Sequence, residues 1–234
     1  MLIAEQVFLL LTNDKGGGEA WVSHRNLALN GALLCDLAAH NYIALERKRL
    51  SLRVLPAVPS TSVQDPLLRH GVAELERKGE RRLTSLLESG KFAQPSVVAQ
   101  RFVANGVLAQ EEKGFLFVSW NKYPTLDPSV EANLRARFQQ TLHGQGQESW
   151  DEAVVLTLLD AIEAIGPVLK QETKGTTRRD RRETLGEIAY SLVSPELERT
   201  GALLSDTVQA VRQSIVEIIE EERRQAQAQA RARR

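Results

Sequence analysis

The side chains that could carry catalytic or metal chemistry are few, and their spacing matches no known site. The four histidines, His24, His40, His70 and His143, show no spacing typical of metal ligands. Cys35 lies in an apolar stretch, which favours a buried hydrophobic role. Because it is the one cysteine in the sequence, an internal disulfide is excluded. The sequence lacks the motifs of serine nucleophiles, phosphate-binding loops and dinucleotide folds. We therefore expect a protein that is not an enzyme and holds no metal or cofactor.

An anion site is a stronger candidate at the start of the second predicted helix. Trp21 precedes Ser23, the expected N-cap, and Arg25 follows within one turn. The free N–H groups and the positive dipole of a helix start favour an anion. An indole with an arginine beside it could hold or cover a phosphate headgroup. The alternative is that Trp21 packs across the helix start as a hydrophobic staple.

A second candidate surface is a β-hairpin, with strands expected at 107–109 and 115–118 and Glu-Glu-Lys-Gly as the turn. Period-two alternation makes both faces of the second strand apolar. The residues that form these faces are Phe115, Leu116, Phe117, Val118 and Trp120. One face can meet the core, and the other needs a helix, a second subunit or lipid. Tryptophan is also typical of membrane interfaces.

Charge excludes a protein that binds polyanions over its whole surface. Lys and Arg total 30 and Asp and Glu total 30, so the net charge is zero. Two local basic segments, 178–182 and 223–234, are expected to be solvated or to attract an anionic membrane. The second segment has five arginines and no acid, so we expect a folded domain over 1–222 and a disordered basic tail over 223–234.

The elements that must position these residues are mostly helical. Hydrophobic residues make up 42% of the chain and aromatics only 5%, which favours helices built on aliphatic side chains. Helices are expected over 2–12, 23–40, from Pro66, 83–87, 95–103, 128–142, 152–165 and 206–222, with strand-like runs over 42–54. The helix over 152–165 is apolar on most sides and should be central, ending at Gly166-Pro167. We expect one compact, mainly α domain with a central helix bundle and one or two β-hairpins.

The order of helix and hairpin between Pro95 and Val118 also occurs in winged-helix DNA-binding modules. The helix offers only Arg101 as a strong phosphate ligand, whereas DNA-binding helices usually carry a richer basic face. We therefore expect no nucleic-acid partner. No segment reaches the roughly 20 apolar residues needed to cross a bilayer, and the N-terminus is unlike a signal peptide. We expect a cytoplasmic protein that can lie on the cytosolic face of a membrane.

Short segments spread over most of the chain, from about residue 2 to about 215, resemble the Golgi phosphoprotein 3 family. They are Leu2-Ile-Ala-Glu-Gln-Val-Phe-Leu-Leu-Leu, Trp21 with Gly31-Ala-Leu-Leu-Cys-Asp-Leu-Ala, Ile43-Ala-Leu-Glu, Asp65-Pro-Leu-Leu, Asn105-Gly-Val-Leu, Phe115-Leu-Phe and Tyr123-Pro-Thr. The resemblance implies a compact helical fold and a peripheral membrane protein that binds phosphatidylinositol 4-phosphate. It also implies a hairpin used in oligomerisation and membrane contact.

The lipid pocket that the resemblance implies is altered in this sequence. Its tryptophan matches Trp21, but its first arginine falls at Asn30 and its other two near Phe92 and Pro95, so one of four positions is kept. Neutral side chains cannot replace bidentate arginine contacts to phosphate. The cations near these positions in the sequence are Arg25, Lys91 and Arg101. The sequence is similar to bacterial-type members of the family.

Two functions remain open on this basis. The first is a non-catalytic peripheral membrane protein that binds an anionic phospholipid headgroup with Trp21, Arg25 and Asn30 and contacts the membrane through the hairpin. The second is a soluble oligomerisation or protein-interaction module, in which the same hairpin meets another copy and no lipid is bound.

Overall fold

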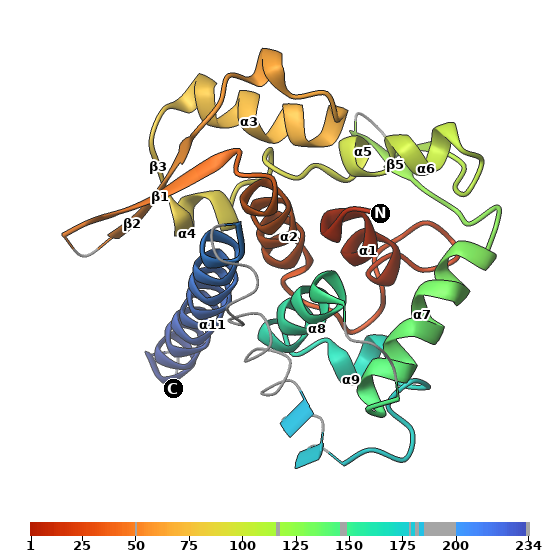
Figure 1. Cartoon of the computed structure of the whole chain (residues 1–234). Helices are drawn as coiled ribbons and strands as arrows, with labels where there is room; N and C mark the ends of the chain where they lie inside the picture. The colour runs from red at the N-terminus through yellow and green to blue at the C-terminus, as the bar shows by residue number, and fades with distance from the viewer. Residues whose placement is uncertain are drawn as a thin grey trace.

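Four helices bury their apolar faces against one another at the centre of the molecule. They are α1 (Ile3–Leu10), α2 (Arg25–Ala39), α8 (Trp150–Ala161) and α11 (Thr200–Ala232). Helix α2 contacts each of the other three, and Figure 1 shows it in the middle of this group. The expected central helix bundle is therefore confirmed. The computed structural model describes residues 1–49, 51–115, 118–145, 149–177, 179–180, 183–184 and 200–232.

Close approach of α2 to its neighbours depends on Gly31. A Cβ atom at this position would lie 2.6 Å from Val211 Cγ1 of α11 and 3.2 Å from Leu158 Cδ2 of α8. Both neighbouring side chains are fully buried. Any larger residue would therefore push the three helices apart or force their side chains from favoured rotamers.

The apolar segment around residues 150–170 is two helices, and the expected single helix over 152–165 is wrong. Helix α8 ends at Ala161, because Glu163 adopts a left-handed φ of 57°. The N–H of Ala164 donates to Leu159 O (2.7 Å) and that of Glu163 donates to Asp160 O (2.9 Å), the pairing of a Schellman C-cap. Gly166-Pro167 lie inside the short helix α9 (Ile165–Val168), where a first-turn proline is tolerated.

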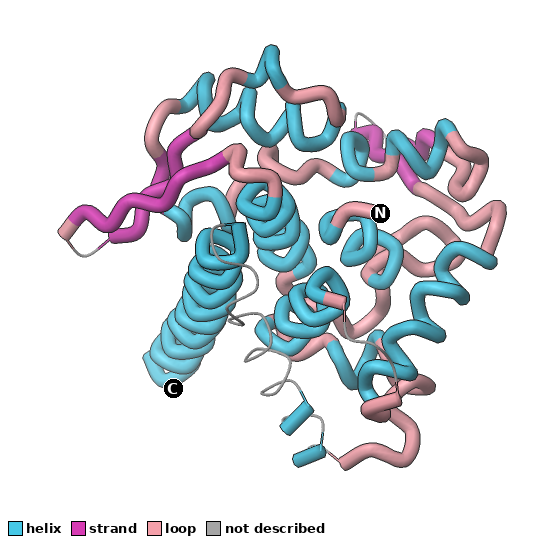
Figure 2. The backbone as a smooth tube through the Cα atoms, in the orientation of Figure 1, coloured by secondary structure: helices cyan, strands magenta, loops and turns pink. Residues whose placement is uncertain are grey.

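A three-stranded antiparallel sheet, shown in magenta in Figure 2, confirms the strand-like runs expected over 42–54. Strands β1 (Ile43–Lys48), β2 (Ser51–Pro56) and β3 (Arg81–Arg82) lie in the order β1-β2-β3. Ile43 and Val54 point to the core and are buried. The opposite face carries Glu46, Lys48, Arg53 and Arg82, because side chains alternate along each strand.

The remaining described helices surround this core. They are η1 (Ser60–Ser62), α3 (Pro66–Lys78), α4 (Leu83–Leu87), α5 (Pro95–Val98), α6 (Gln100–Ala104) and α7 (Ser129–Leu142). The Asp65 side chain caps α3 by accepting from the N–H groups of Leu67 (2.9 Å) and Leu68 (3.2 Å). The single helix expected over 95–103 is divided at Ala99, whose ψ of −15° departs from the α-helical value.

The predicted hairpin exists, but its register differs from the expected one. Strand β4 (Glu111–Phe115) pairs with β5 (Val118–Lys122), so the expected turn Glu-Glu-Lys-Gly forms most of β4. The expected first strand over 107–109 contributes only an isolated bridge between Leu108 and Thr125. The polar run Glu-Glu-Lys-Gly predicted a turn, yet it forms a strand. The side chains of residues 111–114 and 119–121 are all exposed, so no buried face requires apolar and polar residues to alternate.

The last helix is longer than expected at both ends. Helix α11 begins at Thr200 and continues to Ala232, so residues 223–232, for which the sequence predicts disorder, are helical and exposed. Alanine, glutamine, glutamate and arginine all have high helix propensity. Arg223 pairs with Glu163 (2.6 Å) and Gln225 donates to Glu221 (3.0 Å), which supports the extension. Figure 1 shows α11 running to the C-terminus at the edge of the molecule.

The basic segment 178–182 lies largely outside the described residues. Among the helices that are described, none is both long enough and apolar enough to cross a membrane.

Candidate functional site

Trp21 is the most exposed large hydrophobic residue among those described, with 92% of its surface open to solvent. Its φ of 68° is left-handed, which is uncommon for a bulky residue. Helix α2 begins at Arg25, after an N-cap formed by His24 rather than by the expected Ser23. His24 is also left-handed, with φ 61°, so two of the four residues before α2 have this conformation, and the Trp21 ring stays open to solvent. The hydrophobic-staple alternative for Trp21 is therefore wrong.

Arg25 points into the protein, although the sequence places it one turn from Trp21. One guanidinium nitrogen, Nη2, donates to Thr12 Oγ1 at 2.6 Å, and the group lies 5.4 Å from the centre of the Phe8 ring. Burial lowers the pKa of Arg25, and the nearby Glu19 carboxylate opposes that shift. These contacts commit Arg25 to fixing the start of α2 against the end of α1.

Asn30 is buried, and its amide is fully used inside the fold. Its Nδ2 donates to the carbonyl oxygens of Leu87 (2.7 Å) and Ser89 (2.8 Å), and its Oδ1 accepts from the N–H of Ala93 (2.9 Å). Asn30 therefore ties α2 to the loop after α4, and it offers no group to an anion. Lys91 lies in that same loop with an exposed side chain.

Arg101 connects helices through two ion pairs. It pairs with Glu5 of α1, where Nη1 lies 3.2 Å from Oε1, and with Asp65, the cap of α3. Burial raises the pKa of Glu5, while the backbone N–H of Leu2 and the charge of Arg101 both act to lower it. The five residues predicted to bind an anion therefore occupy separate environments, and the structure does not gather them into one pocket.

A buried carboxyl group, which was not among the candidate residues from the sequence, lies near these ion pairs. Asp36 of α2 accepts from the backbone N–H groups of Ile3 and Ala4, both at 2.8 Å, and so caps α1. Burial raises the pKa of Asp36 to about 8, although these two hydrogen bonds act to lower it. Asp36 thus joins α1 and α2, a role that no spacing in the sequence reveals.

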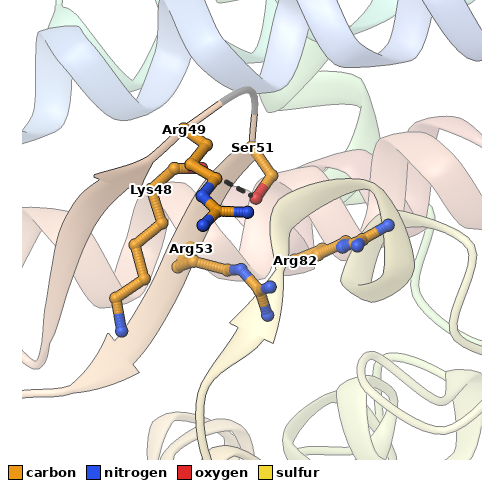
Figure 3. Close-up of a pocket in the computed structure, with 5 residues that line it drawn as sticks. All are labelled: Lys48, Arg49, Ser51, Arg53 and Arg82. Atoms are coloured by element: carbon orange, nitrogen blue, oxygen red, sulfur yellow. Dashed lines mark hydrogen bonds between the residues drawn. The ribbon is translucent and has the colours of Figure 1, made fainter.

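Within the described part of the chain, a cavity lined by cationic side chains lies on the outer face of sheet β1–β2–β3. It has a volume of about 660 Å³ and is lined by Lys48, Arg49, Ser51, Arg53 and Arg82. Figure 3 shows the Arg49 guanidinium turned toward Ser51, while Lys48 of β1 and Arg82 of β3 extend to opposite sides of Arg53. The sequence predicted strand-like runs over 42–54 but gave no role to the basic residues Arg47, Lys48 and Arg49 within them. The signal in the sequence was this basic run together with Arg81-Arg82, and the strand register places Lys48 and Arg82, but not Arg47 or Arg81, on the outer face.

The hairpin residues predicted to contact membrane or a second copy are only partly described. Trp120 of β5 is 46% exposed. Phe115 ends β4, but its side chain, like residues Leu116 and Phe117, lies outside the described part of the chain. The described part of the hairpin is therefore a pair of mostly polar strands that exposes the indole of Trp120.

The helices and two small antiparallel sheets define a mainly helical protein domain. The model of the Golgi phosphoprotein 3 family matches residues 3–215, which is most of the chain, so the chain belongs to this family. The match extends from α1 into α11 and confirms the resemblance found in the sequence. A comparison with curated proteins gives no significant match. Among the described residues, no group of three or more histidine, cysteine or carboxylate side chains could hold a metal ion.

Proposed function

We propose that this protein is a non-catalytic, peripheral binder of anionic phospholipid surfaces that acts at the cytosolic face of a membrane. The observation that carries the proposal is the exposure of Trp21. A tryptophan whose surface is 92% open gains by leaving water, and its amphipathic ring suits the headgroup region of a bilayer. Membership of the Golgi phosphoprotein 3 family supports the same conclusion.

The ligand-binding chemistry differs from the pocket that the sequence resemblance implies. Asn30 is occupied with backbone partners, and Arg25 and Arg101 are held by Thr12 and by carboxylates. Attraction to an anionic surface must therefore come from cations elsewhere, while Trp21 supplies apolar insertion.

Vesicle flotation tests this proposal. We expect the full chain to float with phosphatidylcholine vesicles that contain phosphatidylserine, and to float less with phosphatidylcholine alone. Trp21→Ala should lower partitioning at least about tenfold, because the apolar contact with the bilayer is lost. Trp150→Ala is the matched control, since Trp150 is 40% exposed at the start of α8. Equal lack of binding to both vesicles would overturn the proposal.

Self-association through the hairpin is a second candidate, favoured by the isolation of β4 and β5. A two-stranded sheet is marginally stable by itself, and the side chains of residues 111–114 and 119–121 in this one are exposed. Pairing with the hairpin of a second copy would cover Trp120. Light scattering of Trp120→Ser against the unchanged chain tests this. An unchanged oligomeric state would exclude Trp120 from any such interface.

A further inference from the structure

The strand register gathers cations on the outer face of sheet β1–β2–β3. Residues directly opposite each other in an antiparallel sheet share a face. Arg53 pairs with Arg82 and with Glu46, and Ser51 pairs with Lys48. Four residues of the β1–β2 hairpin therefore share one face with Arg82 of β3. Their opposite face carries Ile43 and Val54, which are buried.

The carboxylates near this face neutralise only part of its charge. Lys48 Nζ lies 2.6 Å from Glu80 and 3.5 Å from Glu46. Arg53 Nε lies 3.3 Å from Glu80, an ion-pair contact without hydrogen-bond geometry. Lys48, Arg49, Arg53 and Arg82 are four cations against these two carboxylates, which leaves a net charge of +2.

Arg49 and Arg82 supply that excess. Among the described residues, neither of them has a carboxylate partner, and both side chains are exposed. Arg49 has a left-handed φ of 49° at the β1–β2 turn, and in Figure 3 its guanidinium folds back over the strands toward Ser51. The Ser51 hydroxyl donates to the Lys48 carbonyl oxygen (3.3 Å) and so fixes the β1–β2 turn between the two strands. The face therefore presents two guanidinium groups, each a planar, bidentate donor, at one concavity.

From this arrangement we propose that the outer face of sheet β1–β2–β3 is a binding site for a dianionic phosphate group. Two guanidinium groups can each donate a pair of hydrogen bonds to phosphate oxygens, and Lys48 adds a point charge. Glu80 is a positioning residue, because it holds Lys48 and Arg53 in place. A hydrogen bond from Lys48 lowers the pKa of Glu80, so this carboxylate stays charged. Trp21 is not among the residues that line this site, so phosphate binding here does not require membrane insertion.

The first arm of the test uses inorganic pyrophosphate and calorimetric titration of the full chain. We expect Arg49→Gln/Arg82→Gln to weaken binding at least about tenfold, because charged hydrogen bonds to phosphate are lost. Arg77→Gln/Arg224→Gln is the matched control, since it removes two exposed arginines elsewhere. Glu46→Gln should tighten binding about threefold, because it removes one repelling carboxylate. Equal affinity in the two double variants would overturn the proposal.

The second arm distinguishes a lipid headgroup from a free phosphate. Vesicles with phosphatidylinositol 4-phosphate are compared with phosphatidylserine vesicles of the same total charge. A preference for the first that is lost in Arg49→Gln/Arg82→Gln identifies the headgroup as the source. Pyrophosphate binding with no vesicle preference identifies a soluble phosphate. A short DNA duplex bound in preference to pyrophosphate through these arginines would overturn the assignment of ligand class.

These outcomes also separate this site from the proposed membrane function. Vesicle binding that survives Arg49→Gln/Arg82→Gln, with no pyrophosphate binding in any variant, removes the phosphate site and leaves membrane insertion through Trp21 intact. If the unchanged chain binds pyrophosphate but does not float with vesicles, the phosphate site stands and the proposed membrane function is removed. Thermal unfolding of each variant shows whether a loss of binding reflects a loss of folding.

Discussion

Replacing Asn30 with leucine separates a structural role for this residue from a ligand-binding role. The family pocket would place a phosphate-binding arginine here, whereas the structure uses the amide to hold the loop over residues 87–93. Asn30→Leu keeps the approximate size of the side chain and removes three hydrogen bonds. The bonds to Leu87 and Ala93 are buried, so the backbone groups they leave behind cannot turn to water.

The magnitude follows from those two buried groups. Each buried backbone group left without a partner costs about 1–3 kcal/mol, and apolar burial of leucine offsets part of this. We expect the free energy of unfolding to fall by about 3 kcal/mol. For a domain of this size that lowers the melting temperature by about 6–12 °C. Urea unfolding followed by circular dichroism measures the first quantity, and calorimetry the second.

The matched control is Asn133→Leu on the exposed side of α7, where we expect a change within about 0.5 kcal/mol. Vesicle binding of the folded Asn30→Leu protein should equal that of the unchanged chain. The opposite result, a change in stability below 1 kcal/mol together with lost vesicle binding, would refute the structural role and restore Asn30 as a ligand residue.

Three further predictions concern the helix core. Gly31→Ala should cost about 1–3 kcal/mol in urea unfolding because the new methyl group overpacks the core, and Gly90→Ala, with open space around it, should not. Arg101→Gln should cost a similar amount because it leaves the buried Glu5 without its cation, and adding Glu5→Gln should restore most of the loss in the same assay. Burial raises the folded-state pKa of Asp36 from 3.8 to about 8, so its contribution to stability is full below about pH 4 and is lost as the pH rises to about 8. Asp36→Asn should flatten that fall in calorimetry, and equal slopes for the two proteins would contradict the assignment.

Local patterns in the sequence were sufficient for most helices and for strands β1 and β2 of the first sheet, but not for β3. Asp65-Pro66 marks the start of α3 because a carboxylate cap and a first-turn proline act within four residues. The apolar run of α1 and the spacing in α2 likewise predict buried helices. Segments made mainly of polar residues were predicted less well than apolar ones. The register of β4–β5 and the helical end of α11 both lie in exposed segments, where no buried face constrains the chain.

The family could be read from the sequence by itself, because it depends on residue type and order along the chain, whereas the exposure of Trp21 was decided by the structure. The roles of the polar side chains could not be read from the sequence either. Arg25, Asn30 and Arg101 looked like ligands for an anion, but their partners lie 13, 57 and 96 residues away and lie inside the fold. Conversely, Arg53 and Arg82 share a face only because β2 and β3 pair in one register. A charge is free for a ligand only if folding brings it no partner, and that is settled by packing between distant segments.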